Sequence, residues 1–234
     1  MPDLIDAFAV AFSLIVEIDS NLLEIVTLSL EVSSLALLMA AVVGLPLGAF
    51  VAVVAFPGRR AVAIGLNTMM GLPPVVVGLV VYLLLSRSGP LGVLGWLFTP
   101  RAMVVAQFLL ITPIVAALSR QVVEDLWEEY GEQLRSLDVR TSRVIPTLLW
   151  DGRHRLLTTL LAGFGRAIAE VGAVIIVGGN IAHLTRVMTT AIALETSKGD
   201  LPLALGLGIL LLLLSLLVNA FAVVARDWAE AVDA

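Results

Sequence analysis

Residues 119–155 read SRQVVEDLWEEYGEQLRSLDVRTSRVIPTLLWDGRHR, and this charged stretch interrupts a chain that is otherwise strongly apolar. It holds six arginines and seven acidic residues, thirteen of the 33 charged residues of the chain, within 37 positions. Charge at this density predicts a segment that lies in water. A long ordered segment between apolar neighbours is usually functional rather than a spacer. The stretches on either side of it decide the fold class.

The flanking sequence is apolar enough to cross a membrane. The 234-residue chain is 59% hydrophobic and 14% charged, with a mean hydropathy of +1.04, whereas about a quarter of a typical soluble domain is charged. Four runs contain no charged residue and are long enough to span a bilayer, which takes roughly 20 helical residues: 32–56, 61–86, 102–119 and 201–225. Because lipid cannot satisfy free backbone groups, we predict an all-α membrane protein with about five transmembrane helices, near 27–56, 61–86, 102–119, 156–177 and 202–225.

The first twenty residues differ from the rest of the chain. They are acidic, and their apolar part, 7–16, is too short to span a bilayer and lacks the basic flank of a signal peptide. We predict an amphipathic helix at the membrane interface, with a sixth short or tilted span as the alternative. The predicted organisation is an interfacial segment at 1–20, a transmembrane domain at 21–228 that includes the 119–155 segment, and a tail at 229–234.

Basic residues predict the orientation, because Lys and Arg are retained in cytoplasmic loops. With the amino terminus outside, the cytoplasmic segments would hold nine arginines: Arg59, Arg60, Arg120, Arg135, Arg140, Arg143, Arg153, Arg155 and Arg226. The external segments would hold four basic residues: Arg87, Arg101, Arg186 and Lys198. The sequence therefore predicts a multi-pass protein of the cell (inner) membrane with its amino terminus outside and its carboxyl terminus in the cytoplasm.

Composition excludes several function classes. The chain has no cysteine, so disulfides, thiolate metal sites and cysteine nucleophiles are ruled out. Its net charge of −5 argues against a nucleic-acid partner. There is no phosphate-binding Gly-x-x-x-x-Gly-Lys motif, and His154 and His183 are the only histidines. We therefore predict no catalytic residue and no metal site in this chain.

Glycine and proline punctuate three of the predicted spans. They form the sequences GLPLG at 44–48 and GLPP at 71–74, and Pro113 stands alone in the third span. Proline removes a backbone donor and kinks a helix. In membrane helices such breaks often border a transport pathway, although a role in helix packing alone is equally consistent with each of them.

Apolar residues recur at helical spacing inside the charged segment. Leu134, Leu137 and Val144 stand between charged residues and predict a short amphipathic helix around 132–143. Such a helix is suited to a groove on a partner protein. An interfacial helix without a partner explains the periodicity equally well.

The same segment resembles the EAA loop of ABC importer permeases, which reads E-A-A-x-x-x-G and is followed by L-P. Glu132 and Leu137 match the motif, whereas its alanines are replaced by Gln133 and Leu134, its glycine by Asp138, and its proline by Trp150. Asp enters the left-handed backbone region more readily than most residues, so the turn of the motif is expected at Asp138. Two further segments strengthen the resemblance, namely GFGRAIAEVGA at 163–173 and GGNI at 178–181, and they are most similar to tungstate permeases, with molybdate permeases second.

This resemblance implies a type I ABC importer permease, a non-catalytic subunit without a cofactor of its own. Two copies would form a homodimer around one pathway in the lipid bilayer, two ATP-binding subunits would bind ATP and Mg, and an extracytoplasmic binding protein would deliver the oxyanion. Tungstate is the expected substrate, with molybdate or sulfate as alternatives. The expected ATPase-docking residues are Glu132, Gln133, Leu134, Leu137, Asp138, Arg140 and Arg143.

Arg166 and Glu170 are the only opposite charges at i and i+4 within a predicted span, so they can pair on one helix face. Together with Gly172 and Asn180 they are the candidate pathway or gate residues, and a pair that only fixes helix packing is the alternative. The competitor from another class is an ion-gradient-driven secondary transporter. It needs coupling carboxylates deep in the spans, where only Glu170 qualifies.

Overall fold

A computed structural model describes residue 13 and residues 20–233, and in this part of the chain the secondary structure is helical throughout. The predicted interfacial helix at 1–20 falls almost entirely outside the described residues. The elements are α2 (Ser20–Val53), α3 (Arg59–Met69), α4 (Pro74–Leu85), η1 (Gly92–Leu94), α5 (Pro100–Ser136), α6 (Thr141–Asp151), α7 (Arg153–Ile168), α8 (Gly172–Gly178), α9 (Met188–Lys198) and α10 (Leu201–Asp233).

The helices account for up to five membrane passes. Three of them contain stretches long and apolar enough to cross alone, and these are Asn21–Val53, Pro100–Ser136 and Leu201–Phe221. Two further passes are helix pairs, α3 with α4 and α7 with α8, which bend by 100° and 55° respectively. The prediction of about five helical spans is confirmed. Within the spans predicted at 61–86 and 156–177 the helix is broken, and the second break has no proline to announce it.

The first bend follows from local sequence. α3 ends after Met69, Pro73 is extended with φ −65° and ψ 122°, and Pro74 begins α4. Proline is favoured at the first position of a helix because its missing N–H would have no helical partner there. The GLPP sequence therefore ends one helix and starts another, as its composition predicts.

The GLPLG sequence acts differently, because α2 continues through Pro46 and α5 continues through Pro113. A methyl group at Gly44 would lie 3.0 Å from the Val115 side chain, and one at Gly48 would collide with the Ala116 carbonyl oxygen. Both glycines therefore let α2 and α5 approach closely. For this pair of helices the packing alternative is the one that the structure supports.

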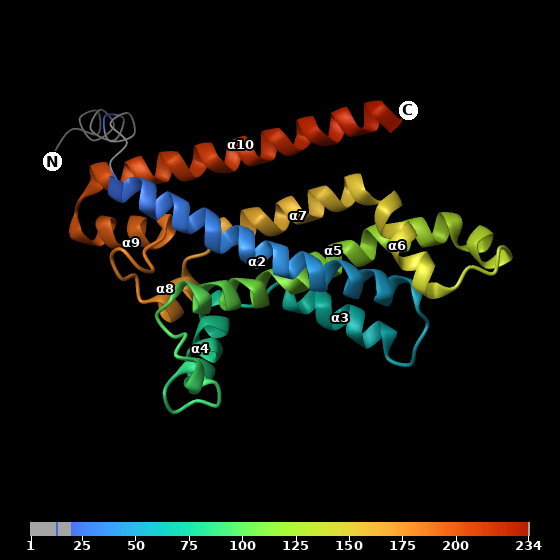
Figure 1. Cartoon of the computed structure of the whole chain (residues 1–234), viewed down its shortest axis with the longest axis horizontal. Helices are drawn as coiled ribbons and strands as arrows, with labels where there is room; N and C mark the ends of the chain where they lie inside the picture. The colour runs from blue at the N-terminus through green and yellow to red at the C-terminus, as the bar shows by residue number, and fades with distance from the viewer. Residues whose placement is uncertain (1–12, 14–19, 234) are drawn as a thin grey trace.

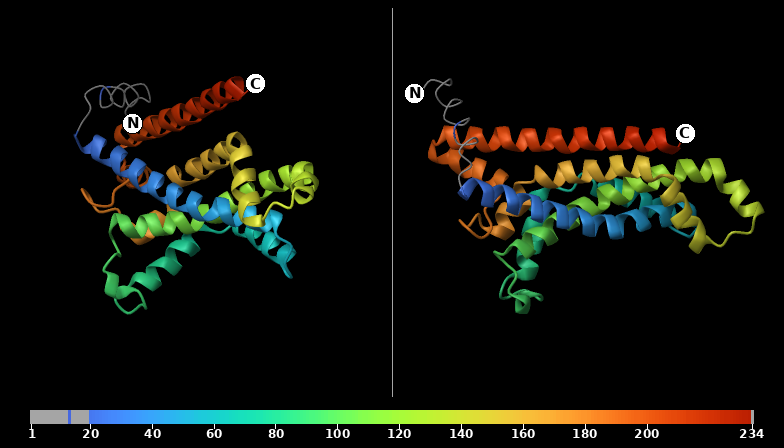
Figure 2. Two further views of the ribbon diagram at one scale, coloured as in Figure 1. Left: turned by 45° about the vertical axis from the view of Figure 1, so that its right-hand side comes forward. Right: turned by 45° about the horizontal axis from the view of Figure 1, so that its top comes forward.

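The long helices run roughly along one axis of the molecule, and they bring distant segments to its two ends (Figure 1, Figure 2). One end holds the start of α3, the end of α5, α6, the start of α7 and the end of α10. The other holds the start of α2, α4, α9 and the start of α10. α5 has 37 residues and is therefore about 55 Å long, well beyond the roughly 30 Å of a bilayer core. It continues past the predicted span 102–119 far into the charged segment.

Candidate functional site

The charged segment 119–155 is a helical hairpin rather than a loop. α5 extends to Ser136, a tight turn follows, and α6 returns along Thr141–Asp151 before α7 begins at Arg153. The predicted short helix around 132–143 is therefore wrong, because its middle is the turn. That turn is centred on Asp138, which has φ 47°, so the expected left-handed residue is found where the EAA motif places glycine.

α6 packs onto α5 through one apolar face. Val144 and Leu148 are buried in a cluster with Val122, Val123 and Leu126 of α5. A methyl group at Gly152 would lie 3.0 Å from Leu126 Cδ1, so the chain passes closely behind α5 where α6 ends. The opposite face of α6 is exposed, and it carries Arg143, Pro146 and Trp150.

The predicted docking residues divide between the inside and the outside of this hairpin. Leu134 packs against the same cluster as Val144, whereas Leu137 is 73% exposed at the tip. Glu132 is exposed, and its carboxylate has no ion-pair partner within the described ranges 13 and 20–233. The exposed members of the predicted set are Glu132, Gln133, Leu137, Asp138, Arg140 and Arg143.

A small cavity opens between the two arms of the hairpin. Its volume is about 310 Å³, and Gln133, Leu134 and Leu137 of the predicted set line it together with Thr147 and Leu148 of α6. The fold therefore gathers three of the seven predicted docking residues around one concave site. Trp150 of α6, which replaces the proline of the EAA motif, lies beside this cavity and is 72% exposed. The Arg153 guanidinium lies 5.2 Å from the centroid of the Trp150 ring.

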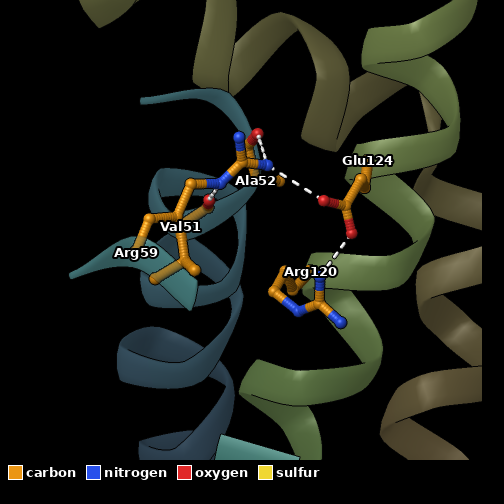
Figure 3. A network of polar contacts seen from close by, with 5 residues as sticks. All are labelled: Val51, Ala52, Arg59, Arg120 and Glu124. Atoms are coloured by element: carbon orange, nitrogen blue, oxygen red, sulfur yellow. Dashed lines mark hydrogen bonds and ion pairs between the residues drawn. The ribbon is translucent and has the colours of Figure 1, made fainter. Parts of the chain in front are cut away.

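An ion-pair network fixes the base of the hairpin to the other helices (Figure 3). Arg59 donates to the carbonyl oxygens of Val51 and Ala52 at 2.7 Å, and its Nη2 also lies 2.9 Å from Glu124 Oε1. Arg120 binds the other oxygen of the same carboxylate. Arg59 thus satisfies free carbonyls at the end of α2 and ties the start of α3 to α5. Sequence reasoning used these arginines only to predict orientation.

The second candidate site is the bend between α7 and α8. Glu170 lies in the bend and is 3% exposed. Its carboxylate accepts a bond from Arg166 Nη1 at 2.5 Å and from the backbone N–H of Ala173 at 3.1 Å, while the hydroxyl of Thr189 donates to its carbonyl oxygen at 2.8 Å. The predicted Arg166–Glu170 pair is present, and the same carboxylate caps the start of α8.

The two bends of the molecule meet at this point. A methyl group at Gly78 of α4 would lie 2.8 Å from Ala173 Cα, and one at Gly172 would lie 3.0 Å from Val75 Cγ2. α4 and α8, the second halves of the two broken spans, are therefore packed backbone to backbone. Among the other glycines of the segments 163–173 and 178–181, Gly163 and Gly178 also allow close contact, whereas a methyl group at Gly165 would meet open space.

Asn180 lies apart from this junction. It follows α8, at the opposite end of that helix from Glu170, and has φ 50°. Its Nδ2 donates to the Thr190 carbonyl oxygen at 3.2 Å and so anchors the connection to α9, a helix that the sequence analysis did not predict. The structure thus brings Arg166, Glu170 and Gly172 together and leaves Asn180 about 10 Å further along the chain, the length of α8. Within residues 13 and 20–233 there is no group of three or more His, Asp or Glu side chains placed to hold a metal ion.

The stretch of this chain that matches known proteins includes both candidate sites. Residues 44–230 match the family model described as binding-protein-dependent transport system inner membrane component. The chain is 40% identical over 215 residues to the tungstate uptake system permease protein TupB of Peptoclostridium acidaminophilum, covering 92% of this chain and 94% of that one. It is 34% identical over 214 residues to TupB of Campylobacter jejuni, covering 92% and 90% respectively. The molybdenum transport system permease protein ModB of Azotobacter vinelandii is 30% identical over 187 residues, covering 73% of this chain and 79% of its own.

Proposed function

We propose a specific transport role for this chain from one premise: it belongs to the family of binding-protein-dependent transport system inner membrane components. It is a multi-pass inner-membrane permease of the ABC type. Its proposed role is the import of tungstate. The observation that carries the choice of tungstate is that two relatives named as tungstate uptake permeases each align with 92% of this chain.

Molybdate is the second candidate, because a relative named as a molybdenum permease aligns over a smaller share of the chain. The cognate binding protein is the part of the system expected to select the anion. Binding of tungstate, molybdate and sulfate to that protein is measured by calorimetry. Tight binding of tungstate supports the proposal, and preference for molybdate or sulfate by more than tenfold contradicts it.

The hairpin of α5 and α6 is the proposed docking site for an ATP-binding subunit, which would hold ATP and Mg. This role is supported by the exposed tip at Leu137 and by the concave site between the arms. The hairpin would then lie in the cytoplasm. Because the end of α10 lies at the same end of the molecule and the start of α2 at the other, the carboxyl terminus is proposed to be cytoplasmic and the amino terminus outside (Figure 1).

The proposed pathway lies between two copies of the chain, beside the junction of the two bends. Arg166 is the cation that pairs with Glu170 at this junction, and its side chain is 35% exposed while that of Glu170 is 3% exposed. The pair keeps Glu170 neutralised inside the protein and leaves one side of the guanidinium accessible. The proposed pathway residues are Arg166, Gly172 and Asn180. Glu170 is proposed to have a structural role, which is to hold Arg166 in place.

Coupling to ATP is tested by uptake of tungstate into proteoliposomes that contain the permease, the candidate ATPase and the binding protein. Uptake is expected to require both partners and ATP. Uptake by the permease alone, driven by a proton or sodium gradient, would instead identify a secondary transporter.

The docking site is tested with Glu132→Ala, which is expected to weaken co-purification of the ATPase while membrane insertion stays intact. Glu128→Ala is the matched control, because Glu128 is also exposed and lies one turn earlier on α5. Equal co-purification of the two variants would contradict a docking role for Glu132.

A further inference from the structure

A groove between α2 and the start of α5 is lined by one acidic and one basic side chain. Its volume is about 560 Å³, and both Glu31 of α2 and Arg101 of α5 line it. Neither side chain has an ion-pair partner in the described part of the chain, although Arg101 lies 6.0 Å from the ring centroid of Trp96. Both side chains are exposed and therefore accessible to a ligand or a partner.

The positions of these charges in the sequence fix their depth in the membrane. Glu31 immediately precedes the charge-free run 32–56, and Arg101 immediately precedes the charge-free run 102–119. Each run crosses the hydrocarbon core, so both charges lie at its edge, at the level of the lipid headgroups. This edge is at the end of the molecule opposite the α5–α6 hairpin (Figure 1). Trp96, in the same groove, is the residue type typical of that level.

The rest of the groove is apolar and leads into the hydrocarbon layer. Leu35 and Met39 lie one and two turns deeper than Glu31 on α2, and Val104 and Val105 lie about one turn deeper than Arg101 on α5. Leu35 is 44% exposed and Met39 is 39% exposed. The groove therefore combines a charged mouth with apolar walls beneath it, which is the shape and polarity of a phospholipid.

We propose that this groove binds a phospholipid whose headgroup carries both a phosphate and a primary ammonium, as phosphatidylethanolamine does. Arg101 would pair with the phosphate, Glu31 with the ammonium, and an acyl chain would lie along Leu35 and Met39. One cation and one anion at the mouth favour a zwitterionic headgroup, because an anionic headgroup would leave Glu31 unpaired. A trimethylammonium headgroup offers no N–H donor to the carboxylate.

The test is native mass spectrometry of the full-length protein in nanodiscs with equal amounts of phosphatidylethanolamine, phosphatidylglycerol and phosphatidylcholine. Wild-type protein is expected to retain phosphatidylethanolamine preferentially. Glu31→Gln should lower the preference over phosphatidylglycerol about threefold, the size expected for one partly exposed ion pair. Arg101→Gln should lower retention of all three lipids, and Met39→Trp should do so with both charges intact by filling the groove.

Matched controls are Glu24→Gln and Arg87→Gln, which remove charges outside this groove. The proposal is overturned if Glu31→Gln keeps the wild-type lipid preference, or if the controls lose lipid to the same extent as the groove variants. It is also overturned if a second copy of the chain fills the groove. Because the chain has no cysteine, Met39→Cys gives a unique site, and efficient cross-linking of two copies by a short bismaleimide would show that outcome. None of these results depends on which oxyanion is transported.

Discussion

The two bent spans, α3 with α4 and α7 with α8, are broken by different means. The bend between α3 and α4 is made by neighbouring residues, since Pro73 is extended and Pro74 starts the new helix without needing a backbone partner. The bend between α7 and α8 contains no proline, and it is held by Glu170, which binds Arg166, the Ala173 N–H and, through its carbonyl, Thr189. The first bend is therefore a local property. The second combines local contacts of Glu170 with distant ones, namely the bond from Thr189, 19 positions away, and the packing of α8 against Gly78 of α4.

The largest effect is expected at the second bend. Glu170→Ala leaves Arg166 without its partner and α8 without its cap. Because the Arg166 side chain is 35% exposed, the expected cost is that of one charge-assisted hydrogen bond and one cap, about 2–4 kcal/mol. The free energy of unfolding is measured by denaturant titration in detergent micelles, with Glu132→Ala as the exposed control. A loss below about 1 kcal/mol would contradict the structural role of Glu170.

A double variant separates charge from capping. Glu170→Gln keeps the size of the side chain and an acceptor oxygen but leaves the Arg166 charge unbalanced. Arg166→Gln combined with Glu170→Gln removes that charge as well. The double variant is expected to be more stable than Glu170→Gln alone, because uncompensated charge is the dominant cost. If the two are equally stable, the cap is the more important contact.

The contact between the two bends is tested at Gly78. In Gly78→Val the new Cβ atom would lie 2.8 Å from Ala173 Cα, which is too close for two carbon atoms. Overpacking of this kind lowers the free energy of unfolding by about 1–3 kcal/mol. Gly65→Ala is the control, because a methyl group there meets nothing within 4 Å. Thermal unfolding followed by circular dichroism compares them, and equal midpoints would show that α4 and α8 can separate without cost.

A smaller effect is expected at Thr189, whose hydroxyl donates to the Glu170 carbonyl oxygen. Thr189→Val keeps the shape of this buried side chain and removes one hydrogen bond, so a loss of about 1 kcal/mol is expected by denaturant titration. Thr68→Val on α3 is the comparison, because the Thr68 hydroxyl bonds within its own helix and is exposed. A greater loss for Thr68→Val would contradict the dependence of the second bend on distant contacts.

The smallest effect is expected at the first bend. Alanine is also accepted at the start of a helix, so Pro74→Ala should lower the free energy of unfolding by only about 0.5 kcal/mol. This is the size expected when a proline no longer restricts the unfolded chain. The bend itself should remain. Spin labels at Val62→Cys and Leu83→Cys, introduced into the cysteine-free chain, measure it by electron paramagnetic resonance. A straightened α3–α4 pair in the Pro74→Ala variant would show that the proline alone makes the bend.

The candidate sites show the same division between local and distant causes. The turn at Asp138 and the pairing of Arg166 with Glu170 were predictable, because each depends on residues within four positions. The clamp of Arg59 on Glu124 joins residues 65 positions apart, and no periodicity in the sequence relates them. Leu134 packs inside the hairpin and Leu137 is exposed at its tip, and this difference depends on where α6 returns. The helix predicted at 132–143 did not include that return.

The apolar runs, four of them free of charge and a fifth holding only Arg166 and Glu170, determined by themselves that this chain crosses the membrane as about five helical passes, because an apolar segment of that length has no other way to satisfy its backbone in lipid. They did not determine where a pass is broken without proline, nor which side chains meet across helices. The tertiary structure decided both, since the Thr189 hydroxyl of α9 binds the Glu170 carbonyl oxygen at the second bend and small residues such as Gly78 set which helices can touch. Both depend on helices that are brought together only in the folded chain.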